Sequence, residues 1–568
     1  MIKRILIKWQ RKSKRKYNQD IDPDEIFLDS SNLPQNDLDQ FEGRLEKPIS
    51  KANLWALFGL CLVILILFGG RVWFLQLNKG EEYALRSRSN FLKNTLIFSE
   101  RGIITDRYDK YLAWNVIDND EPEFTKRQYS AYAGISNLLG YVKYPQKDKL
   151  GFYYSDVLEG KDGIEKYFND DLAGKNGVRI VEVNALGKVQ SSSTVALPQN
   201  GKNLKLSIDA GLQDKLYEIM HELANRVGFT GGSGAMMDIK TGEVIFSASY
   251  PEYNSQVLTD GDDSRRIASY VNDPKMPFLN KVMDGAYTPG SIVKPFMALA
   301  ALKEKIIDPA TSIYSSGQLV LPNPYDANKP TIFKDWKALG YMDMRHAIAQ
   351  SCDVYFYEIG GGFEKQEGLG INRIYKYMHD VFGFGEAIKS SFFTGVAGTV
   401  PSMAWKKENF TDGVWRIGNT YHTSIGQYGF QVSPIQMLRA ISTIPNDGKM
   451  IEPTILFGQA PIVSGQVDMP AEYFKIVREG MRLGAIEGTG SGLNTTAVKI
   501  ATKTGTAELG ELKNKVNSWV TGFFPYDNPR YSFVIMMERG PLGNLYGATY
   551  VMRQLVDWMA IYRSEYFQ

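Results

Sequence analysis

The chain has 568 residues, 43% of them hydrophobic and 23% charged, so it can bury more than one core and should form two or three domains. Its formal net charge of +2 argues against nucleic acid as a partner. Only Cys61 and Cys352 are present, far apart in the sequence, which excludes a disulfide framework. None of the four histidines has a recognisable catalytic context, so a lysine is a better candidate base than a Ser-His-Asp arrangement.

An apolar run begins at Leu54 and continues to Phe68, and residues 69–77 extend it. About 20 apolar residues cross a bilayer, so residues 54–76 are predicted to be one transmembrane anchor. A cleaved signal peptide is the competing interpretation. It would normally lie nearer the N-terminus, have a shorter apolar core and end in a small-residue cleavage site.

Lysines and arginines crowd residues 3–16, before the predicted span. Positive charges flanking a span usually stay in the cytoplasm, so residues 1–53 are predicted to be a cytoplasmic tail and everything after Leu77 to lie outside. The basic tract is interpreted as a topology signal that also touches anionic lipid, and a partner-binding arm is the alternative.

Residues 77–200 contain short strand candidates, such as 101–107 and 177–184, separated by glycine, asparagine and aspartate. This pattern predicts a strand-rich stalk, or pedestal, domain. No carboxylate or metal-ligand constellation there indicates catalysis, so a spacer or a docking surface is expected.

Residues 201–568 are predicted to form a second extracytoplasmic domain of α+β class, because strand candidates at both ends enclose a mostly helical middle. An amphipathic helix over 212–227 precedes a predicted hairpin over 234–249. The C-terminal strand candidates are residues 498–509, 518–524 and 531–537. An amphipathic helix at residues 550–562 is expected to pack on their sheet.

Ser291 follows the turn formers Pro289 and Gly290 and precedes an apolar helical pattern, so it should lie at a helix N-terminus. Lys294, three residues later, shares its helix face. A lysine can take a serine's proton if burial favours the neutral amine, and the helix terminus can stabilise a developing oxyanion. Alone the motif is weak, because a capping serine with a solvated lysine is the ordinary interpretation.

Two further motifs follow in order: Ser351-Cys-Asp353 before an apolar helix, and Lys503-Thr-Gly-Thr506 in a strand near the C-terminus. Each has a structural explanation by itself, as a helix cap or as an edge-strand charge. The ordered set Ser-x-x-Lys, Ser-x-Asn/Asp and Lys-Thr-Gly is typical of penicillin-binding proteins and serine β-lactamases.

With these motifs, the chain resembles class B penicillin-binding proteins, the monofunctional peptidoglycan D,D-transpeptidases. Further stretches are similar to family landmarks: residues 101–107, 163–165 and 423–427, and Trp519. Asp353, where asparagine is more frequent, is closer to the elongation type, penicillin-binding protein 2, than to the division type. Thr502 stands where glycine is common, which affects only the expected strand packing.

The resemblance implies an antiparallel sheet with helices on both sides, carried on the stalk. It implies that Ser291 attacks the penultimate D-alanine carbonyl of a stem peptide, with Lys294 as base. Ser351 would relay protons to the leaving amine, and Lys503 would tune that network. The implied substrate-binding residues are Asp353, Thr504, Gly505 and Thr506. Of these, Thr504 and Thr506 would contact the substrate carboxylate through their hydroxyls.

The implied partners are peptidoglycan stem peptides, the bacterial cytoplasmic membrane, β-lactams as covalent inhibitors, and a polysaccharide polymerase of the shape-elongation-division-sporulation family. No cofactor, metal or nucleic acid is expected. A metal cluster of Asp335, Asp343, His346 and Cys352 is conceivable, but its spacing matches no standard site.

Other functions stay open at this point. A β-lactamase would be smaller, normally secreted and without a stalk, whereas a β-lactam sensor would need a signalling module. An inactive scaffold for a polymerase and a division-type transpeptidase are the remaining alternatives.

Overall fold

The computed structural model describes residues 50–84, 92–118, 123–147, 153–183, 189–323, 326, 328–388, 390, 392–510 and 514–568. The chain divides into two compact units, Met1–Asn90 and Phe91–Gln568. In the first unit, helix α2 (Lys51–Trp73) begins where the Ser50 side chain accepts a hydrogen bond from the Asn53 N–H, and a π-helical turn (Phe74–Asn78) continues it. The predicted apolar run therefore forms one helix that is long and apolar enough to cross a membrane. Residues 1–49 of the predicted cytoplasmic tail lie outside the described residues.

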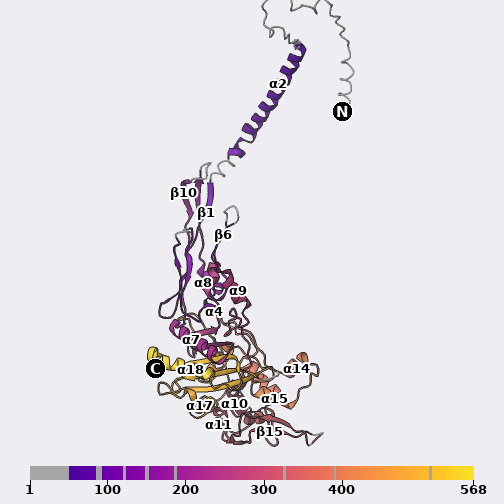
Figure 1. The fold of residues 1–568 in the computed structure, drawn as a ribbon, viewed down its shortest axis with the longest axis vertical. Coiled ribbons are helices and arrows are strands. Elements are labelled where there is room, and N and C mark those ends of the chain that lie inside the picture. The colour runs from indigo at the N-terminus through magenta and orange to yellow at the C-terminus, as the bar shows by residue number, and fades with distance from the viewer. Residues whose placement is uncertain are drawn as a thin grey trace, which may run out of the picture. The chain divides into compact units, whose positions relative to one another are not determined.

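The N-terminal part of the second unit is rich in strands, as predicted (Figure 1). One antiparallel sheet has the order β1-β9-β10, and its strands are β1 (Leu92–Ile97), β9 (Gly177–Val183) and β10 (Val189–Ala196). A second has the order β11-β2-β3-β4, with β2 (Ile104–Thr105), β3 (Tyr111–Val116), β4 (Lys126–Tyr129) and β11 (Leu204–Lys205). Smaller elements complete the stalk: α4 (Ser136–Leu139), β5 (Val142–Lys143), β6 (Gln146–Lys147), β7 (Tyr153–Ser155), β8 (Glu159–Gly160), α5 (Gly163–Tyr167) and α6 (Asn169–Leu172).

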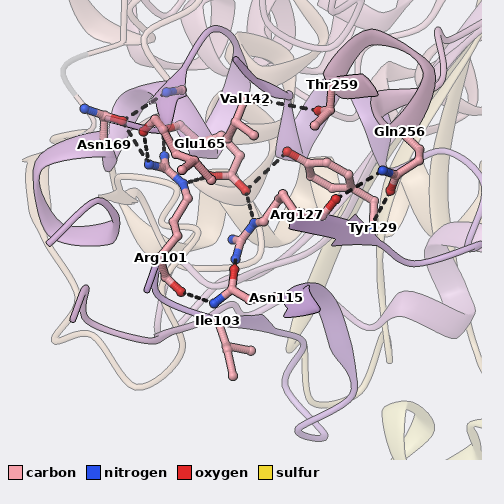
Figure 2. Close-up of polar contacts among 12 residues, drawn as sticks. Arg101, Ile103, Asn115, Arg127, Tyr129, Val142, Glu165, Asn169, Gln256 and Thr259 are labelled. Carbon is pink, nitrogen blue, oxygen red and sulfur yellow. Dashed lines mark hydrogen bonds and ion pairs between the residues drawn. The ribbon is translucent and has the colours of Figure 1, made fainter. Parts of the chain in front are cut away.

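A buried charge network holds the stalk together (Figure 2). Glu165 of α5 accepts hydrogen bonds from Arg101 Nε at 2.6 Å and from Arg127 Nε at 2.8 Å, and all three side chains are buried. Burial raises the pKa of Glu165, but Arg127 and Arg101 together bring it below its ordinary value. Because removing one partner of a buried ion pair leaves an uncompensated charge, this network ties the stalk elements into one arrangement.

The same network reaches α8 (Ser255–Asp260), beyond the stalk (Figure 2). Gln256 Nε2 donates to Arg127 O at 3.1 Å, and Gln256 Oε1 accepts from the Tyr129 N–H at 3.1 Å. The Gln256 amide thus takes the place of a strand neighbour at the edge of β4, and hydrogen bonds between this side chain and the β4 backbone fix the stalk core to the C-terminal part of the unit.

The C-terminal part contains a five-stranded antiparallel sheet of order β13-β12-β22-β21-β20. Its strands are β12 (Gly231–Asp238), β13 (Val244–Tyr250), β20 (Ala501–Leu509), β21 (Lys515–Phe524) and β22 (Tyr531–Pro541). The predicted hairpin and the three predicted C-terminal strands are confirmed, and β20 is an edge strand of this sheet.

Helices cover both faces of the sheet, because successive strand residues point to opposite sides. Val520 belongs to the core under α7 (Ala210–Val227) and α18 (Ala548–Tyr562), and its neighbour Trp519 to the core around α10 (Lys294–Lys303). The expected fold class, an α+β domain with an antiparallel sheet between helices, is confirmed.

The middle of the chain is largely helical, as predicted, and its short two-stranded sheets lie between helices. The helices are α9 (Ser264–Asn272), α11 (Met344–Ala349), α12 (Asp353–Gly361), α13 (Gly370–Tyr375), α14 (Met403–Asn409), α15 (Ile417–Ser424), α16 (Pro434–Ser442) and α17 (Ala471–Ile486). Strands β15 (Gln318–Leu321) and β16 (Thr331–Lys334) form one two-stranded pair, and β14 (Ile313–Ser315) and β17 (Gly340–Met342), which flank them in the chain, form another. A third pair is β18 (Lys449–Ile451) with β19 (Val463–Gln466).

Candidate active site

Ser291 lies in a short 3-10 helix, Gly290–Val293, that leads directly into α10. Gly290 has φ +60°, and its N–H donates to Gly426 O at 3.0 Å. A Cβ on Gly426 would lie only 2.2 Å from Gly290 O, so this close approach requires glycine. Pro295 occupies the first turn of α10, where its missing N–H breaks no helical hydrogen bond. The predicted helix N-terminus is confirmed.

Lys294 is fully buried and joins the first motif to the second. Its Nζ donates to Ser351 O at 2.7 Å and to Asp353 Oδ1 at 2.5 Å, and lies 3.4 Å from Ser351 Oγ. Asp353, expected only as a substrate-binding residue, thus forms an ion pair with the lysine of the first motif.

Ser351 is not the cap of the helix that follows it. Cys352 is the N-cap of α12, and its sulfur accepts from the Tyr355 N–H at 3.4 Å. Ser351 itself has φ +57°, a left-handed conformation that is uncommon outside glycine and recurs at functional sites. Its hydroxyl is thereby left to contact the two motif lysines.

Lys503, on edge strand β20, completes the cluster. Its Nζ donates to Ser351 Oγ at 2.8 Å and to Thr504 O at 2.8 Å. The pKa of Lys503 is lowered well below its ordinary value, mainly by burial and also by the positive charge of Lys294. The Asp353 carboxylate opposes this shift. Burial likewise raises the pKa of Asp353 against the effect of Lys294. The Ser351 hydroxyl lies between the amines of Lys294 and Lys503, an arrangement that can pass protons.

Gly505 allows β20 to approach the Ser291 turn. A Cβ at this position would lie 2.9 Å from Pro289 O and 3.0 Å from Ile292 Cγ2. The Trp519 indole N–H on neighbouring β21 donates to Thr288 O at 3.0 Å and fixes the same turn from the side. A side chain at position 505 would therefore push the strand away from Ser291.

The three motifs meet at a cleft of 670 Å³. Six predicted site residues line it, and Lys294 and Lys503 lie buried beneath: the lining residues are Ser291, Ser351, Asp353, Thr504, Gly505 and Thr506. Trp336, Thr489 and Arg553 also line the cleft, although the sequence did not single them out. Of these three residues, only Thr489 stands in a sequence pattern that could have indicated its position. The flanking glycines in Gly488-Thr-Gly490 are typical of a turn that packs closely against other backbone.

The residues considered for a metal cluster form two separate pairs. Cys352 Sγ lies 3.2 Å from Asp335 Oδ2, and His346 Nδ1 lies 2.7 Å from Asp343 Oδ1. Within the described part of the chain, no three histidine, cysteine or acidic side chains are grouped as metal ligands would be.

Residues 232–557, more than half of the chain, match the family model of the penicillin-binding protein transpeptidase domain. The chain belongs to this family. All three motifs of the cleft fall within the matched range. Residues 123–206 match a second model, the penicillin-binding protein dimerisation domain, which overlaps the stalk.

Known members of this family match most of the chain. Peptidoglycan D,D-transpeptidase MrdA of Haemophilus influenzae is 27% identical over 90% of this chain and 91% of its own length. A solved complex between penicillin-binding protein 2 and MreC from Helicobacter pylori is similar with TM-score 0.68, 26% identity, and coverage of 82% of this chain and 99% of that one. A chain of a peptidoglycan synthase complex, reported for structural coordination of polymerization and crosslinking, has TM-score 0.69, 25% identity, and coverage of 89% and 98%.

Proposed function

We propose that this protein is a membrane-anchored, serine-type peptidoglycan D,D-transpeptidase of the elongation type and a target of β-lactams. The observation that carries the proposal is the position of Ser351 Oγ, 3.4 Å from Lys294 Nζ and 2.8 Å from Lys503 Nζ, in the cleft that Ser291 lines. The extensive similarity to the MrdA transpeptidase supports the substrate class and the elongation role.

In the proposed acylation step, Ser291 Oγ attacks the carbonyl carbon of the donor's penultimate D-alanine, and its proton passes to Lys294. The oxyanion is held by the backbone N–H groups of Ser291 and Thr506. As the carbon–nitrogen bond breaks, the proton travels through Ser351 to the leaving nitrogen, so that D-alanine departs as an amine. The lowered pKa of Lys503 supports its role as a neutral amine that exchanges protons with Ser351.

In the second step, the amine of an acceptor peptide attacks the acyl-serine carbonyl. The new amide forms, the ester bond to Ser291 breaks, and the acceptor's proton returns to the serine through the same residues. The hydroxyls of Thr504 and Thr506 hold the donor's terminal carboxylate during acylation, and Gly505 keeps the strand close enough for this contact. Asp353 accepts a hydrogen bond from Lys294 Nζ, which orients this amine and stabilises it after it has taken the proton.

A chromogenic β-lactam should distinguish this enzyme from a β-lactamase. We expect a burst of about one equivalent and little turnover afterwards, because hydrolysis of an acyl-serine needs a base that activates water. Among the described residues lining the cleft, Asp353 is the carboxylate, and it is already paired with Lys294. The protein pre-treated with unlabelled penicillin is the control and should give no burst. Steady hydrolysis at many turnovers per second would favour the β-lactamase alternative.

The partner is proposed by analogy with the similar structures. One was solved with MreC, and another belongs to a peptidoglycan synthase complex. We therefore propose that a polysaccharide polymerase of the shape-elongation-division-sporulation family associates with this chain through the span and the stalk. Co-purification of the two from mild detergent would support the pairing, and separate elution under the same conditions would contradict it.

Within the described ranges, one helix, Lys51–Asn78, is long and apolar enough to cross a membrane, and it is the proposed anchor. We propose that the N-terminus is cytoplasmic and the cleft extracytoplasmic, because the basic residues of 3–16 precede the span. A protease added to spheroplasts should then cut after Leu77 and leave residues 1–50 intact. Cleavage of residues 1–50 in sealed spheroplasts would reverse the orientation.

A further inference from the structure

The turn between α17 and β20 contributes a second threonine to the cleft, next to Thr504. Thr489 Oγ1 lies 2.5 Å from Thr504 Oγ1, and both residues line the cleft. Thr489 is exposed, and Thr504 is only partly buried. A hydrogen bond between two such side chains adds little to folding, because water satisfies either hydroxyl equally well.

Two glycines allow this turn to pack closely between the second and third motifs. A Cβ on Gly488 would lie 2.1 Å from Ala349 O, and a Cβ on Gly490 would lie 2.4 Å from Thr502 Cγ2. The Thr489 N–H also donates to Ala349 O at 3.1 Å, two residues before Ser351. The position of the Thr489 hydroxyl is therefore fixed relative to both Ser351 and β20.

Arg553 of α18 holds the next part of the turn and brings positive charge to the same wall. Its Nη1 donates to Gly492 O at 3.2 Å and to Asn494 O at 3.1 Å, and its Nε is 2.9 Å from each carboxylate oxygen of Asp557. Gly492 and Arg553 both line the cleft. This wall thus offers hydroxyl donors beside a guanidinium, which suits a carboxylate ligand.

We infer that Thr489 is a positioning residue for the donor's terminal carboxylate and acts through Thr504. Its O–H donates to Thr504 Oγ1, which leaves the Thr504 O–H to donate to the carboxylate and strengthens that second bond. Thr504 follows Lys503 on β20, so their side chains point to opposite faces of the strand. The Thr489–Thr504 hydroxyl pair therefore approaches the substrate from the face opposite to the Lys503 amine. The inference rests on the proposed function, since it assigns a residue to the same substrate.

The test compares acylation of the full-length protein by a penicillin and by its methyl ester, which lacks the free carboxylate. Thr489→Val should lower the second-order rate constant for the penicillin about tenfold, because the Thr504 hydroxyl loses the hydrogen bond that directs it to the carboxylate. The rate constant for the ester should change by less than about twofold. Thr489→Ser should retain the wild-type preference. Thr496→Val, at an exposed threonine of the same α17–β20 connection outside the cleft lining, is the matched control and should leave both rates unchanged.

A double-variant cycle provides the second readout. In a Thr504→Val background, Thr489→Val should cost nothing further, because the residue through which it acts is already lost. Thr489→Ala serves as the alternative variant if valine prevents folding. Equal losses for penicillin and ester, or additive losses in the double variant, would overturn the inference while leaving the proposed function intact. A wild-type protein that neither reagent acylates would contradict the proposed function itself.

Discussion

Ser291→Ala is expected to abolish covalent labelling by penicillin, with at least about a thousandfold loss in acylation rate. The substitution removes the only oxygen that forms the acyl bond in the proposed mechanism. It should leave the fold intact, because Ser291 is half-buried in a turn whose geometry depends on Gly290 and on contacts of Gly505. The neighbouring lysines and Ser351 keep their mutual hydrogen bonds without it.

The measurement is fluorescent penicillin labelling followed by mass spectrometry of the modified peptide. Thermal melting of the same samples checks that the variant is folded. Ser316→Ala is a matched control, because Ser316 is exposed in the connection between β14 and β15 and its hydroxyl bonds only to Gln318 O among the described hydrogen bonds. Labelling of the Ser291→Ala protein at the wild-type rate would remove Ser291 as the nucleophile.

Lys294→Ala is expected to lower acylation by about 10³-fold, because the serine loses its proton acceptor. Lys294→Arg should not restore activity, since a guanidinium stays protonated and cannot act as a base. Both variants also disturb the ion pair with Asp353, and a buried carboxylate without its partner destabilises the fold. The rate must therefore be expressed per folded molecule, counted by the transition in thermal melting.

Lys281→Met is the matched control for this experiment. Lys281 is also fully buried and ion-paired, with Glu538 at 3.6 Å, but it lies outside the cleft-lining set. This variant should lose stability and yet keep its acylation rate per folded molecule. If Lys294→Arg restores acylation, positive charge and not basicity is what the site requires.

Local patterns in the sequence were enough to predict much of the fold. The apolar run formed α2, turn residues and alternation predicted the β12–β13 hairpin, and Pro295 after Ser291 predicted a helix start. These predictions succeeded because capping, turn chemistry and hydrophobic periodicity act between residues a few positions apart. The three motifs indicated a transpeptidase because they are an ordered chemical set.

Tertiary packing alone decided which hydrogen bonds the motif residues form with one another and which of them are buried. Burial first, and the neighbouring charge of Lys294 second, lower the pKa of Lys503, an effect that the Lys-Thr-Gly motif by itself does not reveal. Lys503 and Ser351 are 152 positions apart, and Thr489 reaches Thr504 only because the glycines let α17 pack against β20. Hydrogen bonds and desolvation of this kind depend on distances between segments remote in sequence, and local propensities do not set those distances.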